Sequence, residues 1–493
     1  MIRFTEENGA LIARSRNETI RIEGWGNNAL RVRTTLLKKL PDDAHALTED
    51  VAHSAKVAID EGSETAEIVN GKIKATVNGV GIICFYKDNE LILQEYYSYY
   101  YGSIRKEAIC YKIRSREYKG LASDDFKITV RFESDPKEKL FGMGQYQMPI
   151  LDLKGSVLPL EQRNSQVSVP FVVSSKGYGM LWNNPSSGET AFGTNITKWI
   201  SDESDMVDYW ITADDTPAQI VTNYTECVGR APVMSKDYLG LWQCKLRYRT
   251  PDEVLEVARK YKELGIKLDV IVIDFFHWPH QGDWRFDEKY WSRDAVKAMT
   301  DELHAMGTKV MVSVWPSVDK RSENYYEMEQ KALISTTDVG SVQTYDYEGD
   351  CGTVDFFNPE AQEFVWSKCR QNYRDWGIDL FWLDNSEPDS TKYDFENYRY
   401  YTGRGSKVGC EYPKKYVEAF YNGQEAEGDH EAVNLCRSAW VGSQKYRTLV
   451  WTGDVQSNFE SFKDQVIAGQ NMGLAGIPWW TTDIGGFMTD NWD

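Results

Sequence analysis

The sequence predicts an α/β protein that combines an antiparallel β-sandwich with a parallel β/α barrel. Up to about Ala231, short segments that alternate polar and apolar residues, such as TIRIEGW and KIKATVN, are separated by Gly, Asn and Asp turns. This pattern is typical of antiparallel sheets. Beyond about Met234, apolar runs alternate with amphipathic segments, which indicates parallel strands joined by helices. We therefore predict a β-sandwich domain at residues 1–233 and a barrel domain at residues 234–493.

Seven buried strands can be counted in the barrel half. Their patterns cover residues 239–246, 268–274, 309–316, 378–384, 432–439, 448–454 and 475–483, with helices expected at 251–265, 294–306 and 360–376. A (β/α)₈ TIM barrel needs eight strands, and the residues after 483 contain no further strand pattern. An open doubly wound sheet is the alternative, but no Gly-rich phosphate loop follows the first strand. We therefore expect a TIM barrel that is incomplete in this chain, truncated after strand seven.

Charge and hydropathy exclude several classes of partner. The 493 residues carry a formal net charge of −19, so neither nucleic acid nor an anionic membrane is expected as a partner, because both require a positive surface. The N-terminus has no apolar signal region, and no run of about 18 apolar residues occurs. We therefore expect a soluble, cytoplasmic protein, for which a homo-oligomer remains open.

The sequence contains no recognisable set of metal ligands. Its eight cysteines are scattered without CxxC pairs, which predicts reduced and mostly buried thiols. The closest pair of the six histidines, His277 and His280, has no clustered third ligand in the sequence. We therefore expect neither a metal nor an organic cofactor.

Four of the predicted barrel strands end in an aspartate that has an aromatic residue nearby. The pairs are Asp274 with Phe275, Asp384 with Trp382, Asp454 with Trp451, and Asp483 with Trp480. One such aspartate is often only the N-cap of the following helix. Four of them are better explained by a site, because barrel enzymes place catalytic groups at the carboxyl ends of strands. Converging acids ringed by aromatic residues suit glycosidic bond cleavage, and an oligosaccharide or glycoside is the expected substrate.

Three longer motifs resemble glycoside hydrolase family 31, the retaining α-glucosidase and α-xylosidase family. FWLDNSEPD resembles its nucleophile segment, RSAWVGSQKYRTLVWTGD resembles its acid/base segment, and GIPWWTTDIGGF is similar to the block that follows. FGMGQYQ and VPFVVSSKGYGMLWNNP resemble its N-terminal β-sandwich. Members of the family usually continue through an eighth strand with an Arg-x-His-Gly motif and then β-domains. Nothing after Phe487 resembles these parts, so we expect this chain to lack them, and their presence in the native protein stays open.

The resemblance implies roles for individual residues. Asp384 would be the nucleophile that forms a β-glycosyl ester, and Asp454 would be the acid/base, so that the α configuration is retained. Arg437 would hold the nucleophile ionised and bond sugar hydroxyls. Asp274 would accept hydrogen bonds from hydroxyls of the glycone. Glu387 is expected to orient a neighbour rather than to react.

The aromatic residues of these segments imply the walls of a sugar site. Trp315 and Trp451 would form walls, and Trp382 and Asp483 are further expected substrate-binding residues. The structural alternatives are strand-end caps for the aspartates and plain core packing for the tryptophans.

Phe275 and Phe276 lie where the family adapts to the substituent on C5 of the sugar. Bulk there would disfavour a hydroxymethyl group, so the resemblance implies an exo-acting enzyme that releases α-linked xylose or glucose, with xylose favoured. An α-galactosidase or α-N-acetylhexosaminidase specificity remains open. A transglycosylase with the same residues, or an inactive carbohydrate-binding protein, are the alternatives from other functional classes.

Overall fold

The computed structural model describes residues 2–62, 64–96, 113–387 and 397–489. By its internal contacts the chain divides into two compact units. The first comprises residues 1–161, 168–230 and 458–478, and the second comprises residues 162–167, 231–457 and 479–493. The short segment 162–167 therefore belongs to the second unit, although its neighbours on both sides belong to the first.

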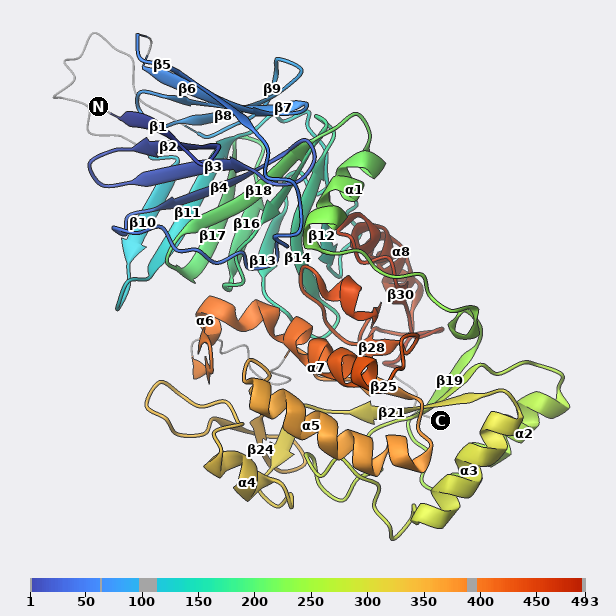
Figure 1. The fold of residues 1–493 in the computed structure, drawn as a ribbon. Coiled ribbons are helices and arrows are strands. Elements are labelled where there is room, and N and C mark those ends of the chain that lie inside the picture. The colour runs from blue at the N-terminus through green and yellow to red at the C-terminus, as the bar shows by residue number, and fades with distance from the viewer. Residues whose placement is uncertain (1, 63, 97–112, 388–396, 490–493) are drawn as a thin grey trace. The chain divides into compact units, whose positions relative to one another are not determined.

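The first unit contains an eight-stranded sheet in the order β1-β2-β3-β4-β18-β15-β14-β12 (Figure 1). Its strands are β1 (Arg3–Glu7), β2 (Ala10–Arg14), β3 (Thr19–Gly24), β4 (Ala29–Thr35), β12 (Leu140–Gln145), β14 (Val167–Ser174), β15 (Tyr178–Trp182) and β18 (Val207–Ala213). The pairs from β1 to β4, and those joining β4, β18, β15 and β14, are antiparallel.

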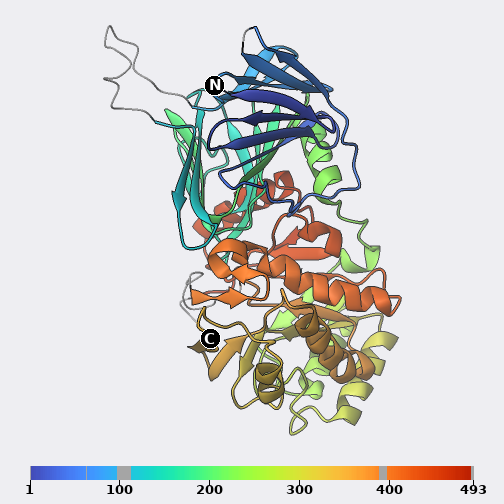
Figure 2. The ribbon, with the colours of Figure 1, turned by 60° about the vertical axis from the view of Figure 1, so that its left-hand side comes forward.

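The described residues of the first unit also form two five-stranded sheets and two helices (Figure 2). One sheet has the order β10-β11-β17-β16-β13, with β10 (Arg116–Gly120), β11 (Phe126–Glu133), β13 (Val157–Leu160), β16 (Gly188–Phe192) and β17 (Ile196–Ser204). The other contains β5 (Lys56–Asp60), β6 (Thr65–Asn70), β7 (Ile73–Asn78), β8 (Ile83–Lys87) and β9 (Glu90–Gln94), in sequence order. The helices are α1 (Pro217–Val228) and α8 (Phe459–Leu474). Buried and half-buried residues alternate along most of β17, as an antiparallel sheet with one core face requires. The predicted N-terminal antiparallel sandwich is confirmed.

The second unit contains a curled parallel sheet in the order β19-β20-β21-β25-β28-β29-β30. Its strands are β19 (Trp242–Lys245), β20 (Val270–Ile273), β21 (Lys309–Val314), β25 (Leu380–Leu383), β28 (Asn434–Cys436), β29 (Thr448–Trp451) and β30 (Trp480–Thr481). Each lies inside one of the seven expected strand patterns, and all six neighbouring pairs are parallel. Among the described residues, no strand joins β30 to β19. The predicted incomplete barrel of the TIM type is confirmed.

The helices of this unit are α2 (Pro251–Glu263), α3 (Arg293–Ala305), α4 (Tyr325–Gln330), α5 (Pro359–Asn372), α6 (Gly405–Val408) and α7 (Tyr412–Ala426). Short 3₁₀ turns occupy Lys236–Tyr238, Arg374–Trp376, Gly409–Glu411 and Ser443–Tyr446. Small antiparallel sheets are formed by β22 (Ser317–Asp319), β24 (Asp350–Thr353) and β23 (Thr344–Asp346), and by β26 (Arg399–Tyr400) and β27 (Gly403–Arg404).

Local sequence explains where the crossover helices begin. Thr250, Ser292 and Asn358 each accept a backbone N–H of the first helical turn, at the starts of α2, α3 and α5.

The strands of the parallel sheet are short apolar runs. All four residues of β20 are buried, as expected when helices and loops cover both faces of a parallel sheet.

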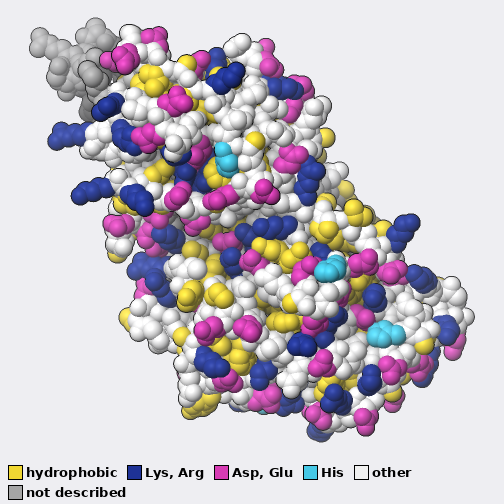
Figure 3. Space-filling model, in the orientation of Figure 1, with side chains coloured by type: hydrophobic (Ala, Val, Ile, Leu, Met, Phe, Trp, Pro, Cys, Tyr) yellow, Lys and Arg dark blue, Asp and Glu magenta, His cyan; other side chains and the backbone are white. Residues whose placement is uncertain are grey.

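Across the described parts of the chain, no helix is both long and apolar enough to cross a membrane. On the face seen in Figure 3, basic and acidic side chains are interspersed, so neither sign of charge dominates that face.

Candidate active site

The four predicted aspartates all follow strands of the parallel sheet in the second unit. Asp274 comes directly after β20 and Asp384 directly after β25, whereas Asp454 and Asp483 come within three residues of the ends of β29 and β30. Because carboxyl ends of parallel strands meet at the same edge of a sheet, the four side chains are brought together. Their charges act on one another: Asp384, Asp454 and Asp483 all help to raise the pKa of Asp274, after the larger effect of its burial.

Asp384 is buried beside a guanidinium. Its backbone N–H donates to the carbonyl of Val314 at 3.0 Å, which ties it to the end of β21. Arg437 Nη1 lies 3.2 Å from Asp384 Oδ1. Burial raises the pKa of Asp384 to about 6, the positive charge of Arg437 opposes that rise, and the charges of Asp454 and Glu387 add to it. The carboxyl group can therefore be ionised at neutral pH despite its burial.

Arg437 is held by Glu387 in a two-point ion pair. Its Nε and Nη2 atoms donate to Glu387 Oε1 and Oε2 at 2.8 and 2.9 Å, and Nη2 also donates to Asn385 Oδ1. This bidentate geometry leaves Nη1 directed at Asp384 and, at 3.9 Å, at Asp454 Oδ2. Burial disfavours the charged guanidinium, but the neighbouring carboxylates raise its pKa overall, so Arg437 stays protonated. Pro388 and Asp389, which complete the FWLDNSEPD motif, lie outside the described residues.

Aromatic residues cluster after β20 and β21. Phe275 stacks on Trp315 with ring centroids 5.2 Å apart, and Phe276 lies 4.4 Å from Phe275. The backbone of Phe276 has φ = 60°, a left-handed conformation that costs about 1–3 kcal/mol for a bulky residue and tends to occur at functional sites. Arg247 places its guanidinium carbon 4.7 Å from the Phe276 ring centroid. The two phenylalanine rings after β20 are therefore packed against Trp315 and Arg247.

A second aromatic pair lies close to Asp384. Trp382 of β25 and Trp451 of β29 meet edge to face, with centroids 5.3 Å apart. The indole nitrogens of Trp382 and Trp315 are buried and have no hydrogen-bond partner among the described residues. Buried donors of this kind are normally satisfied, so both are candidates for binding a sugar hydroxyl.

His277 stabilises the backbone at Asp274. Its Nδ1 lies 2.9 Å from the backbone oxygen of Asp274, and its Nε2 lies 2.9 Å from the hydroxyl of Tyr373. Burial lowers the pKa of His277 to about 4, so the ring is neutral at pH 7. Within the described parts of the chain, no three His, Cys, Asp or Glu side chains are arranged to hold a metal ion.

Asp454 has a partner that the sequence did not indicate. Asn164 Nδ2 donates to Asp454 Oδ2 at 2.6 Å, and the backbone N–H of Asp454 donates to Asn164 Oδ1 at 3.0 Å. The two residues are 290 positions apart, and no periodicity or motif connects them. Burial and the charges of Asp454 and Asp384 raise the pKa of Asp483 to about 7.

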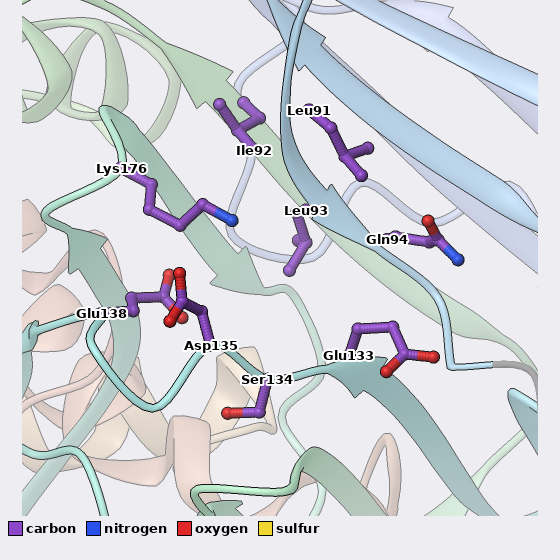
Figure 4. A pocket seen from close by; sticks show the side chains of 9 residues that line it. All are labelled: Leu91, Ile92, Leu93, Gln94, Glu133, Ser134, Asp135, Glu138 and Lys176. Atoms are coloured by element: carbon purple, nitrogen blue, oxygen red, sulfur yellow. The ribbon is translucent and has the colours of Figure 1, made fainter.

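Figure 4 shows a separate pocket in the first unit that contains none of these aspartates. It is lined by Leu91, Ile92, Leu93, Gln94, Glu133, Ser134, Asp135, Glu138 and Lys176. Glu138 accepts hydrogen bonds there from Ser174 Oγ at 2.5 Å and Tyr178 OH at 2.7 Å, and Lys154 Nζ donates to it at 3.1 Å. Because this carboxylate is already hydrogen-bonded by three side chains of its own unit, the candidate active site is the edge of the parallel sheet in the second unit.

The fold and this edge define a class of protein: an α/β barrel with an acidic, aromatic-lined site, as in enzymes that cleave sugars. The family model described as the glycosyl hydrolases family 31 TIM-barrel domain matches residues 231–493. The model of the glycosyl hydrolase 31 N-terminal galactose mutarotase-like domain matches residues 19–190. The chain belongs to glycosyl hydrolase family 31.

Relatives are similar over most of the chain. A family 31 glucosidase from Pseudescherichia vulneris, ORF2, described as uncharacterised, is 46% identical over 100% of this chain and 94% of its own length. An α-xylosidase of Saccharolobus solfataricus is 34% identical over 74% of this chain and 50% of its own length. The crystal structure of a family 31 α-xylosidase from a soil metagenome, complexed with xylose, has a TM-score of 0.94 and 46% identity. That similarity covers 99% of this chain and 73% of the other.

Proposed function

We propose that this protein is an exo-acting retaining α-glycosidase that releases terminal α-linked xylose in preference to glucose from oligosaccharides. The observation that carries the proposal is that one atom, Arg437 Nη1, lies 3.2 Å from Asp384 and 3.9 Å from Asp454. Two carboxylates beside one cation are close enough together to act on a single glycosidic bond.

The two steps use these carboxylates in different protonation states. In the first, Asp384 attacks the anomeric carbon while Asp454 donates its proton to the leaving oxygen, so a β-glycosyl ester forms and the glycosidic bond breaks. In the second, Asp454 takes a proton from water, and the water oxygen displaces Asp384 to give a sugar of α configuration. Arg437 supports the ionised nucleophile, and Asp274, Asp483 and the buried indole N–H groups would bind the glycone.

Xylose is favoured by the residues after β20 and by the relatives. Phe275 and Phe276 are bulky, and their ring positions are held by Trp315 and Arg247. Bulky side chains near C5 of the bound sugar leave no room for the hydroxymethyl group of glucose. They leave room for the hydrogen that xylose carries at that position. Relatives described as α-xylosidases, from Saccharolobus solfataricus and Aspergillus niger, support the same choice.

A screen of the full-length protein on nitrophenyl α-xyloside, α-glucoside and α-galactoside tests the proposal. We expect kcat/KM to be highest on the xyloside, by about 10–200-fold over the glucoside, the range that one methylene-sized group provides. Replacing Phe275 or Phe276 with alanine should lower this ratio, because space for the hydroxymethyl group is opened. Phe364→Ala, at a half-buried phenylalanine on α5, is the matched control and should leave the ratio unchanged. An unchanged ratio in both site variants would remove these residues from specificity.

The pH dependence tests the role of Arg437. Because the pKa of Asp384 is raised to about 6 and the nucleophile must be ionised, kcat/KM should be high above pH 6 and fall as the pH decreases through that value. Arg437 lowers the pKa of Asp384, so Arg437→Met should move this acid limb upward by about one to three pH units.

A buried arginine outside the site provides the control for this measurement. Arg447 lies in the same unit and pairs with Glu425 at 2.9 Å. Arg447→Met should leave the acid limb where it is in the wild type, although it lowers stability. If both variants shift the limb equally, Arg437 has no specific effect on the nucleophile.

Transglycosylation is a second candidate, favoured by a relative described as an isomaltosyltransferase from Sporosarcina globispora. Products formed with added sugar acceptors distinguish it from hydrolysis. The domain boundary at residues 233 and 234, the cytoplasmic location, the absence of a cofactor and a homo-oligomeric state stay predictions.

A further inference from the structure

The segment 162–167, which follows β13 in the sequence, belongs to the second unit, and two hydrogen bonds fix it there. Gln162 Nε2 donates to the carbonyl oxygen of Cys410 at 3.2 Å. Ser438 Oγ donates to Gln162 Oε1 at 2.9 Å, one residue after Arg437 in the sequence. All three of these residues are buried, so the segment is attached to the elements that carry the site.

Asn164 presents both ends of its amide to Asp454. The backbone N–H of Asp454 can only donate, so the atom that faces it at 3.0 Å is the amide oxygen of Asn164. The amide nitrogen is then the atom that lies 2.6 Å from Asp454 Oδ2 and donates to it. Two reciprocal bonds to one residue restrict both the backbone and the carboxyl group of Asp454.

The residue before Asp454 has to be glycine for this approach. Gly453 has φ = +72°, and a Cβ built there would lie 2.6 Å from both Asn164 Oδ1 and the backbone nitrogen of Ser165. Both the dihedral angle and the space exclude a side chain. The strand end and the segment 162–167 are therefore shaped to fit together closely.

We propose that Asn164 is a positioning residue that determines which oxygen of Asp454 transfers the catalytic proton. An N–H donor occupies Oδ2 and favours an unprotonated oxygen at that position, as does Arg437 Nη1 at 3.9 Å. The proton delivered to the leaving group is consequently carried by Oδ1. This inference rests on the proposed role of Asp454 as the acid/base.

The positioning role of Asn164 is tested by comparing kcat/KM for substrates with poor and good leaving groups. A phenyl glycoside needs its leaving oxygen protonated, whereas a 2,4-dinitrophenyl glycoside does not. Asn164→Ala should therefore reduce kcat/KM on the phenyl glycoside by up to about 100-fold, the cost of a misplaced catalytic group, and change it little on the dinitrophenyl glycoside. The glycone is whichever sugar the wild type prefers.

A second variant separates positioning from folding. Asn164→Asp keeps an acceptor for the backbone N–H of Asp454 but loses the donor to Oδ2, so it should show the same selective loss. Asn17→Ala, at an exposed asparagine of the first unit, is the control and should match the wild type on both substrates. Thermal melting of each variant shows whether it is folded. If Asn164→Ala does not fold, Asn164→Asp alone tests the positioning role.

Two results would overturn the proposal. Equal losses on both substrates, or no loss, would reduce Asn164 to a packing residue. Asp454→Ala, measured beside it, identifies a failure of the underlying function: if that variant also loses equally on both substrates, then Asp454 is not the acid/base and the role of Asn164 falls with it. A selective loss in Asp454→Ala without one in Asn164→Asp leaves the mechanism intact and overturns only the positioning role.

Discussion

Replacing Asp384 with alanine is expected to reduce kcat by about 10⁵-fold or more, the order of loss seen when a covalent nucleophile is removed. The reduction should be similar for good and poor leaving groups, because no glycosyl ester can form with either. Adding azide should restore part of the turnover. Azide in the space left by the carboxylate attacks an α-glycoside directly, so the expected product is the β-glycosyl azide.

A matched variant shows whether such a loss reflects chemistry or folding. Asp355 is buried in the same unit, and burial raises its pKa to about 6, as for Asp384. Its carboxylate accepts the backbone N–H groups of Tyr401 and Phe357 at 2.6 and 3.1 Å, so it stabilises local structure. Asp355→Ala should lower the melting temperature while the folded fraction keeps its kcat. If Asp384→Ala is inactivated only in proportion to its unfolding, the nucleophile assignment is wrong.

Replacing Asp454 with alanine should produce a loss that depends on the leaving group. On a phenyl glycoside kcat/KM should fall by about 10²–10⁴-fold, the usual contribution of general acid catalysis. On a 2,4-dinitrophenyl glycoside the first step needs no proton and should proceed, after which the glycosyl-enzyme accumulates because no base activates water.

Azide distinguishes the two carboxylates by stereochemistry. In Asp454→Ala it enters beside the ester and attacks the glycosyl-enzyme, which gives the α-glycosyl azide. Nuclear magnetic resonance of the product measures the configuration directly. A β product from Asp454→Ala would show that the roles of Asp384 and Asp454 are assigned the wrong way round, even though the family is established.

Hydrophobic patterning predicted the main elements of this fold because it depends on neighbours in the sequence. The apolar run of β20 and the start of α2 at Pro251 are local features, and both occur where the sequence predicted them. Helix α7 had no expected counterpart. Its buried residues Tyr412, Tyr416, Phe420 and Gln424 recur every four positions and share one face of the helix, so this segment carries a helical pattern that was not predicted.

In the candidate active site, too, local sequence features were predictable and contacts between distant residues were not. From the sequence alone, Asp274, Asp384, Asp454 and Asp483 were predicted at the carboxyl ends of parallel strands, and parallel strands necessarily bring those ends to one edge. The three-dimensional structure was needed to establish that Asn164, 290 positions away, donates to Asp454. It also decided that Glu387 engages two nitrogens of Arg437 and leaves the third for the acids. Contacts of this kind depend on loop paths between elements, which local propensity and periodicity do not encode.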